Sequence, residues 1–165
     1  YEVNPVIISP ERKAQLNRNL MLFFTGFSRF SSDIQKTTQK DMADKERQLL
    51  EMLSLVDEAE KVLTTKTDLN EFGRLLDYTW KLKRGISSGI STDSIDGLYA
   101  KGIEAGALGG KLLGAGGGGF LLFYVEEDKR EAVAKAMEDL LYVPFQFENS
   151  GTRVIHYTAE MYEKR

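Results

Sequence analysis

A glycine-rich segment is the part of this sequence best suited to chemistry. It comprises five glycines and one alanine, namely Gly114, Ala115, Gly116, Gly117, Gly118 and Gly119. Glycine loses more conformational freedom on folding than any other residue, so it gathers where the backbone needs positive φ or where another group approaches the main chain. The segment predicts either a nest of backbone N–H groups that binds phosphate or another anion, or a surface packed directly against another backbone.

The flanking residues exclude the common nucleotide-binding loops. The pattern G-x-G-x-x-G is present, but a dinucleotide-binding loop opens a helix, whereas residues 120–125 read F-L-L-F-Y-V and predict a buried strand. A Walker loop would end in G-K-S or G-K-T, and a protein kinase would carry further motifs downstream; the sequence has neither. We therefore predict a hairpin between two strands.

Three polar residues accompany the glycines as candidate phosphate ligands. Lys111 lies just before the hairpin, and Thr25 and Arg29 follow the apolar run 20–24. Arginine is the natural bidentate partner of a phosphate, while lysine acts as a point charge. A surface ion pair is the alternative for both cations. The sequence predicts no catalytic residue and no metal site, and the single histidine, His156, is interpreted as structural.

Composition bounds the class of protein. The chain has 165 residues, 42% hydrophobic and 28% charged, which predicts one domain over 1–165 with its own core. A net charge of −3 argues against a nucleic-acid partner, and the absence of cysteine fits a cytoplasmic protein. No apolar run reaches the roughly 20 residues that span a bilayer, so we expect no membrane partner. Because the first residue is Tyr1, we expect the chain to begin inside a longer protein.

The period of the apolar residues predicts the elements that hold the hairpin. Strands are expected at 6–8, at 20–24, on both sides of the glycines, at 144–147 and at 153–157. Helices are expected from before Asp41 to Leu63, over 69–83, from a cap at Ser91 or Thr92 to about Gly106, and over 127–141, with loops at 64–67 and 85–89. This order predicts an α+β fold with helices on one face of a mainly antiparallel sheet.

Two segments resemble a known kinase family. Residues 106–120, G-A-L-G-G-K-L-L-G-A-G-G-G-G-F, closely resemble the third signature motif of the GHMP small-molecule kinases, named for galactokinase, homoserine, mevalonate and phosphomevalonate kinases. Residues 24–29, F-T-G-F-S-R, resemble the T-G-x-x-R strand end of the same carboxy-terminal half. The resemblance covers nearly all of the chain and implies a ferredoxin-like domain. Within the family, the loop is most similar to that of the D-glycero-D-manno-heptose 7-phosphate kinases, with fucose kinases the nearest alternative.

The resemblance implies an ATP-dependent sugar kinase. The complete enzyme would use ATP and Mg²⁺ to phosphorylate the anomeric hydroxyl of heptose 7-phosphate or, as the alternative acceptor, L-fucose. The six hairpin residues, Lys111, Thr25 and Arg29 would face the phosphoryl-transfer cleft. The family's ATP loop, metal-coordinating acid and base belong to an amino-terminal domain, and their motifs are not in residues 1–165. We therefore expect this chain to be inactive alone and to need its own amino-terminal kinase domain as partner.

A second class of function also fits these residues. A free-standing ferredoxin-like module that binds a small anion or a partner protein, without catalysis, would use the same hairpin. The upstream gene sequence discriminates between the two. A preceding P-x-x-x-G-L-G-S-S indicates a kinase, whereas a start codon just before Tyr1 indicates a binding module.

Overall fold

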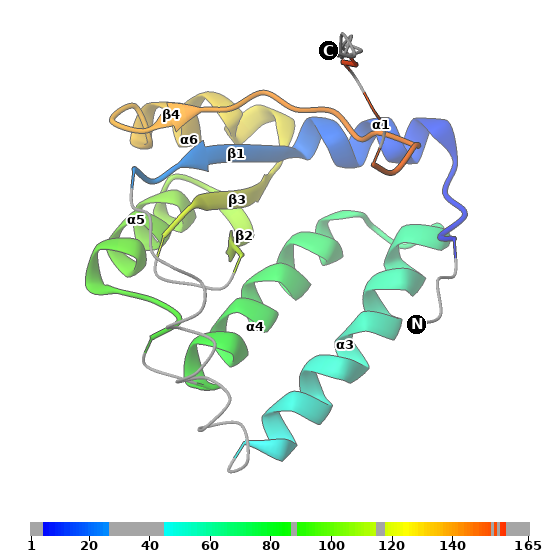
Figure 1. Cartoon of the computed structure of the whole chain (residues 1–165), viewed down its shortest axis with the longest axis horizontal. Coiled ribbons are helices and arrows are strands. Elements are labelled where there is room, and N and C mark those ends of the chain that lie inside the picture. The colour runs from blue at the N-terminus through cyan, green and yellow to red at the C-terminus, as the bar shows by residue number, and fades with distance from the viewer. Residues whose placement is uncertain are drawn as a thin grey trace, which may run out of the picture.

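The fold is known from a computed structural model, which describes residues 5–26, 45–86, 89–114, 118–152, 154 and 156–157. The elements in chain order are α1 (Pro10–Asn19), β1 (Leu20–Phe24), α3 (Glu46–Thr64), α4 (Asn70–Ile86), α5 (Asp93–Glu104), β2 (Ala107–Leu113), β3 (Phe120–Val125), the 3-10 turn η1 (Glu127–Lys129), α6 (Arg130–Ala136) and β4 (Leu141–Tyr142) (Figure 1). None of the described helices has the length and apolar character needed to cross a membrane.

The described strands form one antiparallel sheet in the order β2-β3-β1-β4. The hairpin joins β2 to β3, with Leu113 opposite Phe120. Phe24, the last residue of β1, is also opposite Phe120. The predicted α+β class with an antiparallel sheet is thus confirmed, and the end of β1 lies beside the glycine hairpin.

Alternating residues of β3 belong to two different parts of the core. Phe123 is fully buried in a cluster with residues of α5 and α6, such as Ile95 and Val133. Tyr124 is equally buried but packs with Leu69, which precedes α4, and with residues of α4 such as Phe72. Helices α5 and α6 therefore cover one face, as expected, while α4 crosses the edge strand β2 and contacts the other face. Helix α3 lies alongside α4 (Figure 1).

Two glycines allow α4 to lie directly on β2. A Cβ atom added at Gly109 would be 1.9 Å from the carbonyl oxygen of Gly73 and 2.8 Å from the backbone nitrogen of Asp77. A Cβ at Gly73 would be 2.7 Å from the ring of Tyr124. Neither position has room for a side chain. Glycine thus packs against backbone at Gly109, five residues before the segment for which the sequence offered such packing as an alternative, and this contact sets the position of α4.

The amino-terminal segment differs from the sequence prediction. Residues 6–8, predicted as a strand, have no regular structure, and Ile7 is 83% exposed. They lead into α1, which the apolar period does not predict. The Ser9 hydroxyl accepts a hydrogen bond from the Arg12 N–H, and Pro10 begins the helix, which together form a favourable helix start.

The carboxy-terminal segment also differs. The helix predicted for 127–141 consists of η1 and the short α6, which ends at Ala136. Leu141 pairs with Phe24 in β4, and residues 143–148 form no strand, since Pro144 lacks an N–H for a ladder. Of the strand predicted at 153–157, the described residues 154, 156 and 157 are not in a strand.

The central helices follow the prediction more closely. Helix α3 ends at Thr64, and Thr92 caps α5 by accepting from the Ile95 N–H. Helix α4 continues to Ile86, into the loop predicted at 85–89. The predicted start of the first long helix, before Asp41, lies outside the described residues.

Candidate functional site

Thr25, at the end of β1, is hydrogen-bonded to the glycine hairpin. Its backbone N–H and its hydroxyl both donate to the carbonyl oxygen of Gly119, each at 2.9 Å. Thr25 is 5% exposed, so water competes little for these hydrogen bonds. The next residue, Gly26, has φ of 75°, a conformation that side chains rarely adopt. Two segments 94 positions apart in the sequence therefore meet here.

Both ends of the hairpin have left-handed backbone conformations. Gly114 has φ of 94° and Gly119 has φ of 110°. Any L side chain is strained at such angles, so glycine is required at these two positions by the backbone itself. Gly118 precedes the second of them, in a bend. Ala115, Gly116 and Gly117 lie outside the described residues, so the predicted anion nest stays a prediction.

Lys83 is a cation at the hairpin that the sequence prediction missed. Its Nζ atom donates to the carbonyl oxygen of Gly114 at 3.1 Å. Because α4 contacts Gly109 near Asp77 and reaches Gly114 six residues later, helix and strand run in the same direction. In the sequence, Lys83 is one polar residue in a helical repeat. Only the packing of α4 on β2 brings it to the hairpin.

Lys111 lies on β2 opposite Leu122 and is partly exposed. Because side chains alternate along a strand, Lys111 lies on the same face of β2 as Gly109, the face that packs against α4 and on which Lys83 reaches Gly114. Burial lowers the pKa of Lys83, and the positive charge of Lys111 lowers it further. Among the described residues, no carboxylate lies within ion-pair distance of either lysine. The structure thus places the ammonium groups of Lys83 and Lys111 beside the hairpin, and neither has an acidic partner among the described residues.

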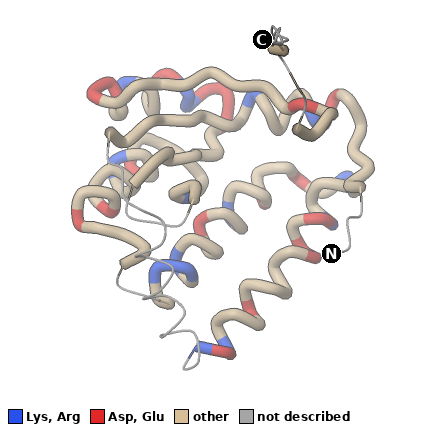
Figure 2. Tube along the Cα trace, in the orientation of Figure 1, with Lys and Arg blue, Asp and Glu red and all other residues tan. Residues whose placement is uncertain are grey.

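The neighbouring cations of α4 are paired, in contrast to Lys83. Figure 2 shows the basic residues gathered at the carboxy-terminal end of this helix. Lys81 is 2.6 Å from the carboxylate of Asp77, and Arg84 is 2.7 Å from that of Asp96. The guanidinium of Arg84 also lies 5.8 Å from the ring centres of two buried aromatic residues, Trp80 and Tyr99. These two cations serve the structure of α4 and α5.

Tyr99 of α5 connects that helix to α4. Its hydroxyl donates to Oδ1 of Asp77 at 2.7 Å. Burial first, and then the hydrogen bond to this carboxylate, raise the pKa of Tyr99 well above its ordinary value. The tyrosine therefore stays neutral and acts as a fixed hydrogen-bond donor from α5 to α4.

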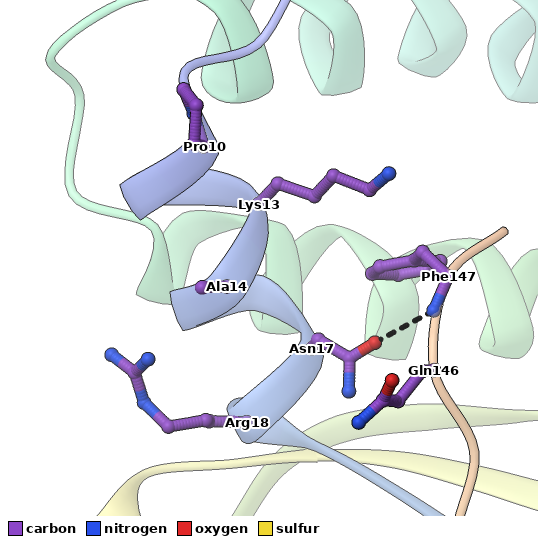
Figure 3. Close-up of a pocket in the computed structure, with 7 residues that line it drawn as sticks. All are labelled: Pro10, Lys13, Ala14, Asn17, Arg18, Gln146 and Phe147. Atoms are coloured by element: carbon purple, nitrogen blue, oxygen red, sulfur yellow. Dashed lines mark hydrogen bonds between the residues drawn. The ribbon is translucent and has the colours of Figure 1, made fainter. Parts of the chain in front are cut away.

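A cavity of about 370 Å³ lies at the other end of β1, between α1 and the carboxy-terminal segment (Figure 3). Asn17 holds the segment by accepting from the Phe147 N–H at 2.9 Å. Of the cations in its wall, Lys13 contacts Asn149 and Arg18 pairs with Glu127. None of the predicted site residues that the structure describes lines this cavity.

The described site therefore comprises the ends of the hairpin, Thr25 and the two lysines. Arg29 lies outside the described residues, so its contact with a phosphate stays a prediction. Within the described ranges, no group of three or more His, Asp or Glu side chains is placed to hold a metal ion. The site offers hydrogen-bond donors and positive charge, which suits phosphate rather than a cation.

The family model of the GHMP kinases C terminal matches residues 55–143. The chain therefore belongs to the GHMP kinase family and contains its carboxy-terminal domain. The matched range begins within α3 and ends just after β4, so it includes Lys83, Lys111 and the whole glycine hairpin.

Three relatives illustrate the similarity. The chain is 30% identical over 155 residues to a D-glycero-alpha-D-manno-heptose 7-phosphate kinase of Campylobacter jejuni. This alignment covers 92% of this chain and 45% of that protein. The chain is 23% identical over 142 residues to a bifunctional fucokinase/GDP-fucose pyrophosphorylase of Arabidopsis thaliana, covering 84% and 13%. The crystal structure of mevalonate kinase from Methanococcus jannaschii has a TM-score of 0.67 at 25% identity, covering 82% and 42%. The chain thus spans less than half the length of each of these relatives.

Proposed function

We propose that this chain is the carboxy-terminal part of an ATP-dependent sugar kinase whose acceptor is D-glycero-D-manno-heptose 7-phosphate. The observation that carries the proposal is the glycine hairpin, held by Thr25 at one end and accompanied by Lys83 and Lys111 at the other. Similarity to the Campylobacter heptose 7-phosphate kinase over 92% of the chain supports this choice of acceptor.

The chemistry of phosphoryl transfer matches such a site. Its transition state is loose, and the charge spreads over the phosphoryl oxygens, so the protein contributes mainly positioning and charge stabilisation. A hairpin without side chains lets phosphate oxygens approach the backbone closely. Lys111 supplies positive charge there, and Arg29 is proposed to hold the phosphate of the acceptor sugar.

The remaining components belong, in this proposal, to an amino-terminal domain in the same cytoplasmic polypeptide. That domain would provide the ATP loop, the acid that holds Mg²⁺ and the base. Residues 1–165 then form one domain that supplies the opposite wall of the cleft. Mg²⁺, held by that domain, would supply positive charge that neutralises the charge developing on the phosphates.

An acceptor panel tests the proposal. A polypeptide that joins this chain to its amino-terminal domain is supplied with ATP, Mg²⁺ and one of heptose 7-phosphate, L-fucose or mevalonate. ADP release gives kcat/KM, and phosphorus NMR identifies the product. We expect the highest kcat/KM with heptose 7-phosphate and a new phosphate on its anomeric oxygen. A preference for L-fucose would change the acceptor, a preference for mevalonate would refute a sugar kinase, and no turnover would favour the non-catalytic anion-binding module.

A further inference from the structure

Lys83 and Lys111 form a pair of like charges that the described residues do not neutralise. Lys81 and Arg84, the neighbours of Lys83 on α4, each have a carboxylate partner. Lys83 instead donates to a neutral carbonyl, that of Gly114. An ammonium group has three donors, and this contact uses one of them.

The arrangement carries an electrostatic cost that an anion removes. Lys83 is half-buried and close to Lys111, and both conditions disfavour its charged form. A phosphate between the two groups turns one repulsion into two attractions and makes charge-assisted hydrogen bonds, which are about twice as strong as neutral ones. The Gly114 carbonyl fixes the position of Lys83 at the start of the hairpin.

We propose that Lys83 and Lys111 together bind one phosphate group beside Gly114, at the end of β2. This inference rests on the proposed function. It assigns Lys83 and Lys111 as the residues of the carboxy-terminal domain that position a phosphate in the cleft. The phosphate belongs either to the polyphosphate chain of ATP or to the phosphorylated sugar. Both sources present the same oxygens, and kinetics separates them.

The first test measures binding to the 165-residue chain. Inorganic phosphate and tripolyphosphate are titrated while the backbone amide signals of Gly114 and Gly119 are followed by NMR. We expect a saturable shift, and an increase in Kd of about tenfold or more in either Lys83→Met or Lys111→Met, since each loses a charge-assisted contact but keeps an apolar stem. Lys83→Arg keeps the charge and should retain most of the binding.

Lys81→Met is the matched control, because this lysine is on the same helix but already has Asp77 as its partner. It should leave the Kd unchanged. The proposal is overturned if neither anion gives a saturable shift, or if the Lys83 and Lys111 variants bind as tightly as the unaltered chain. It is also overturned if Lys81→Met weakens binding equally, since the effect would then be one of net charge. Melting temperatures verify that each variant is folded.

The second test identifies the source of the phosphate in the polypeptide that includes the amino-terminal domain. If Lys83→Met and Lys111→Met both raise the KM for ATP, the pair holds the nucleotide. If both raise the KM for the acceptor, the pair holds the sugar phosphate. If neither variant raises the KM for ATP or for the acceptor, the proposal is contradicted. Because phosphate binding is measured without turnover, an inactive enzyme refutes the proposed function but leaves the anion site to be judged by the first test.

Discussion

Gly109→Ala tests whether close backbone packing of α4 on β2 sets the geometry of the site. The added methyl carbon would lie 1.9 Å from the Gly73 carbonyl oxygen, whereas ordinary van der Waals contact begins at 3.4 Å. Both partners are backbone, so α4 must move away by on the order of 1.5 Å. Such overpacking typically costs 1–3 kcal/mol, and we expect about 3 kcal/mol here because no flexible side chain can yield.

Chemical and thermal unfolding of the 165-residue chain measure this effect. A loss of about 3 kcal/mol lowers the melting temperature by ~6–12 °C in a domain of this size. The displaced helix should also carry Lys83 away from the Gly114 carbonyl and weaken phosphate binding. The expected result is therefore a joint loss of stability and of anion affinity.

Gly97→Ala is the matched control. Gly97 is exposed within α5, and nothing lies within 4 Å of an added Cβ. Alanine is the better helix former by about 1 kcal/mol, so this variant should be more stable than the unaltered chain. If Gly109→Ala is as stable as Gly97→Ala, the close contact of α4 with β2 does not exist, and the explanation for the position of Lys83 is refuted.

Three further variants probe the site and its support. Tyr99→Phe should cost about 1 kcal/mol at neutral pH by removing the hydrogen bond to Asp77. Because the folded chain raises the pKa of this tyrosine above its ordinary 10.0, the unaltered chain should lose stability relative to Tyr99→Phe as pH rises above 10; parallel stability curves would refute this. Thr25→Val removes the hydroxyl hydrogen bond to the Gly119 carbonyl, while the backbone N–H of residue 25 still donates to that carbonyl. The free energy of unfolding in denaturant should therefore fall by only about 1 kcal/mol, and an unchanged midpoint would contradict a role for the hydroxyl. Arg29→Lys, in the polypeptide with its amino-terminal domain, should raise the KM for heptose 7-phosphate and leave that for ATP unchanged, and equal rises would argue against an acceptor contact.

The strongest local patterns in the sequence predicted the centre of the fold. The apolar run 20–24 stops just before Thr25 and Gly26, the apolar run 120–125 begins directly after Gly119, and both form strands. Helix α1 escaped prediction because its sequence is mostly polar, with Leu16 and Asn19 its buried residues. The start of this helix was readable only from Ser9 and Pro10.

Sequence reasoning named candidate site residues where a motif is local and missed Lys83, whose position depends on tertiary packing. The hairpin, Thr25 and Lys111 are recognisable from short sequence patterns. Lys83 is separated from Gly114 by 31 positions, and its contact depends on two glycines, Gly73 and Gly109, that bring a helix onto a strand. Apolar periodicity does not encode such a contact, because it describes which face of a helix is buried and not which strand that face meets.

A comparison of this chain alone with the complete proposed enzyme tests the central claim most directly. The 165-residue chain and the polypeptide that also carries the amino-terminal domain are each given ATP, Mg²⁺ and heptose 7-phosphate, and anomeric phosphate formation is followed by phosphorus NMR. We predict no product with the chain alone and steady turnover with the joined polypeptide, because half of a cleft cannot preorganise the transition state. Metal-dependent phosphorylation by the purified chain, or no phosphorylation by the joined polypeptide, would contradict the account.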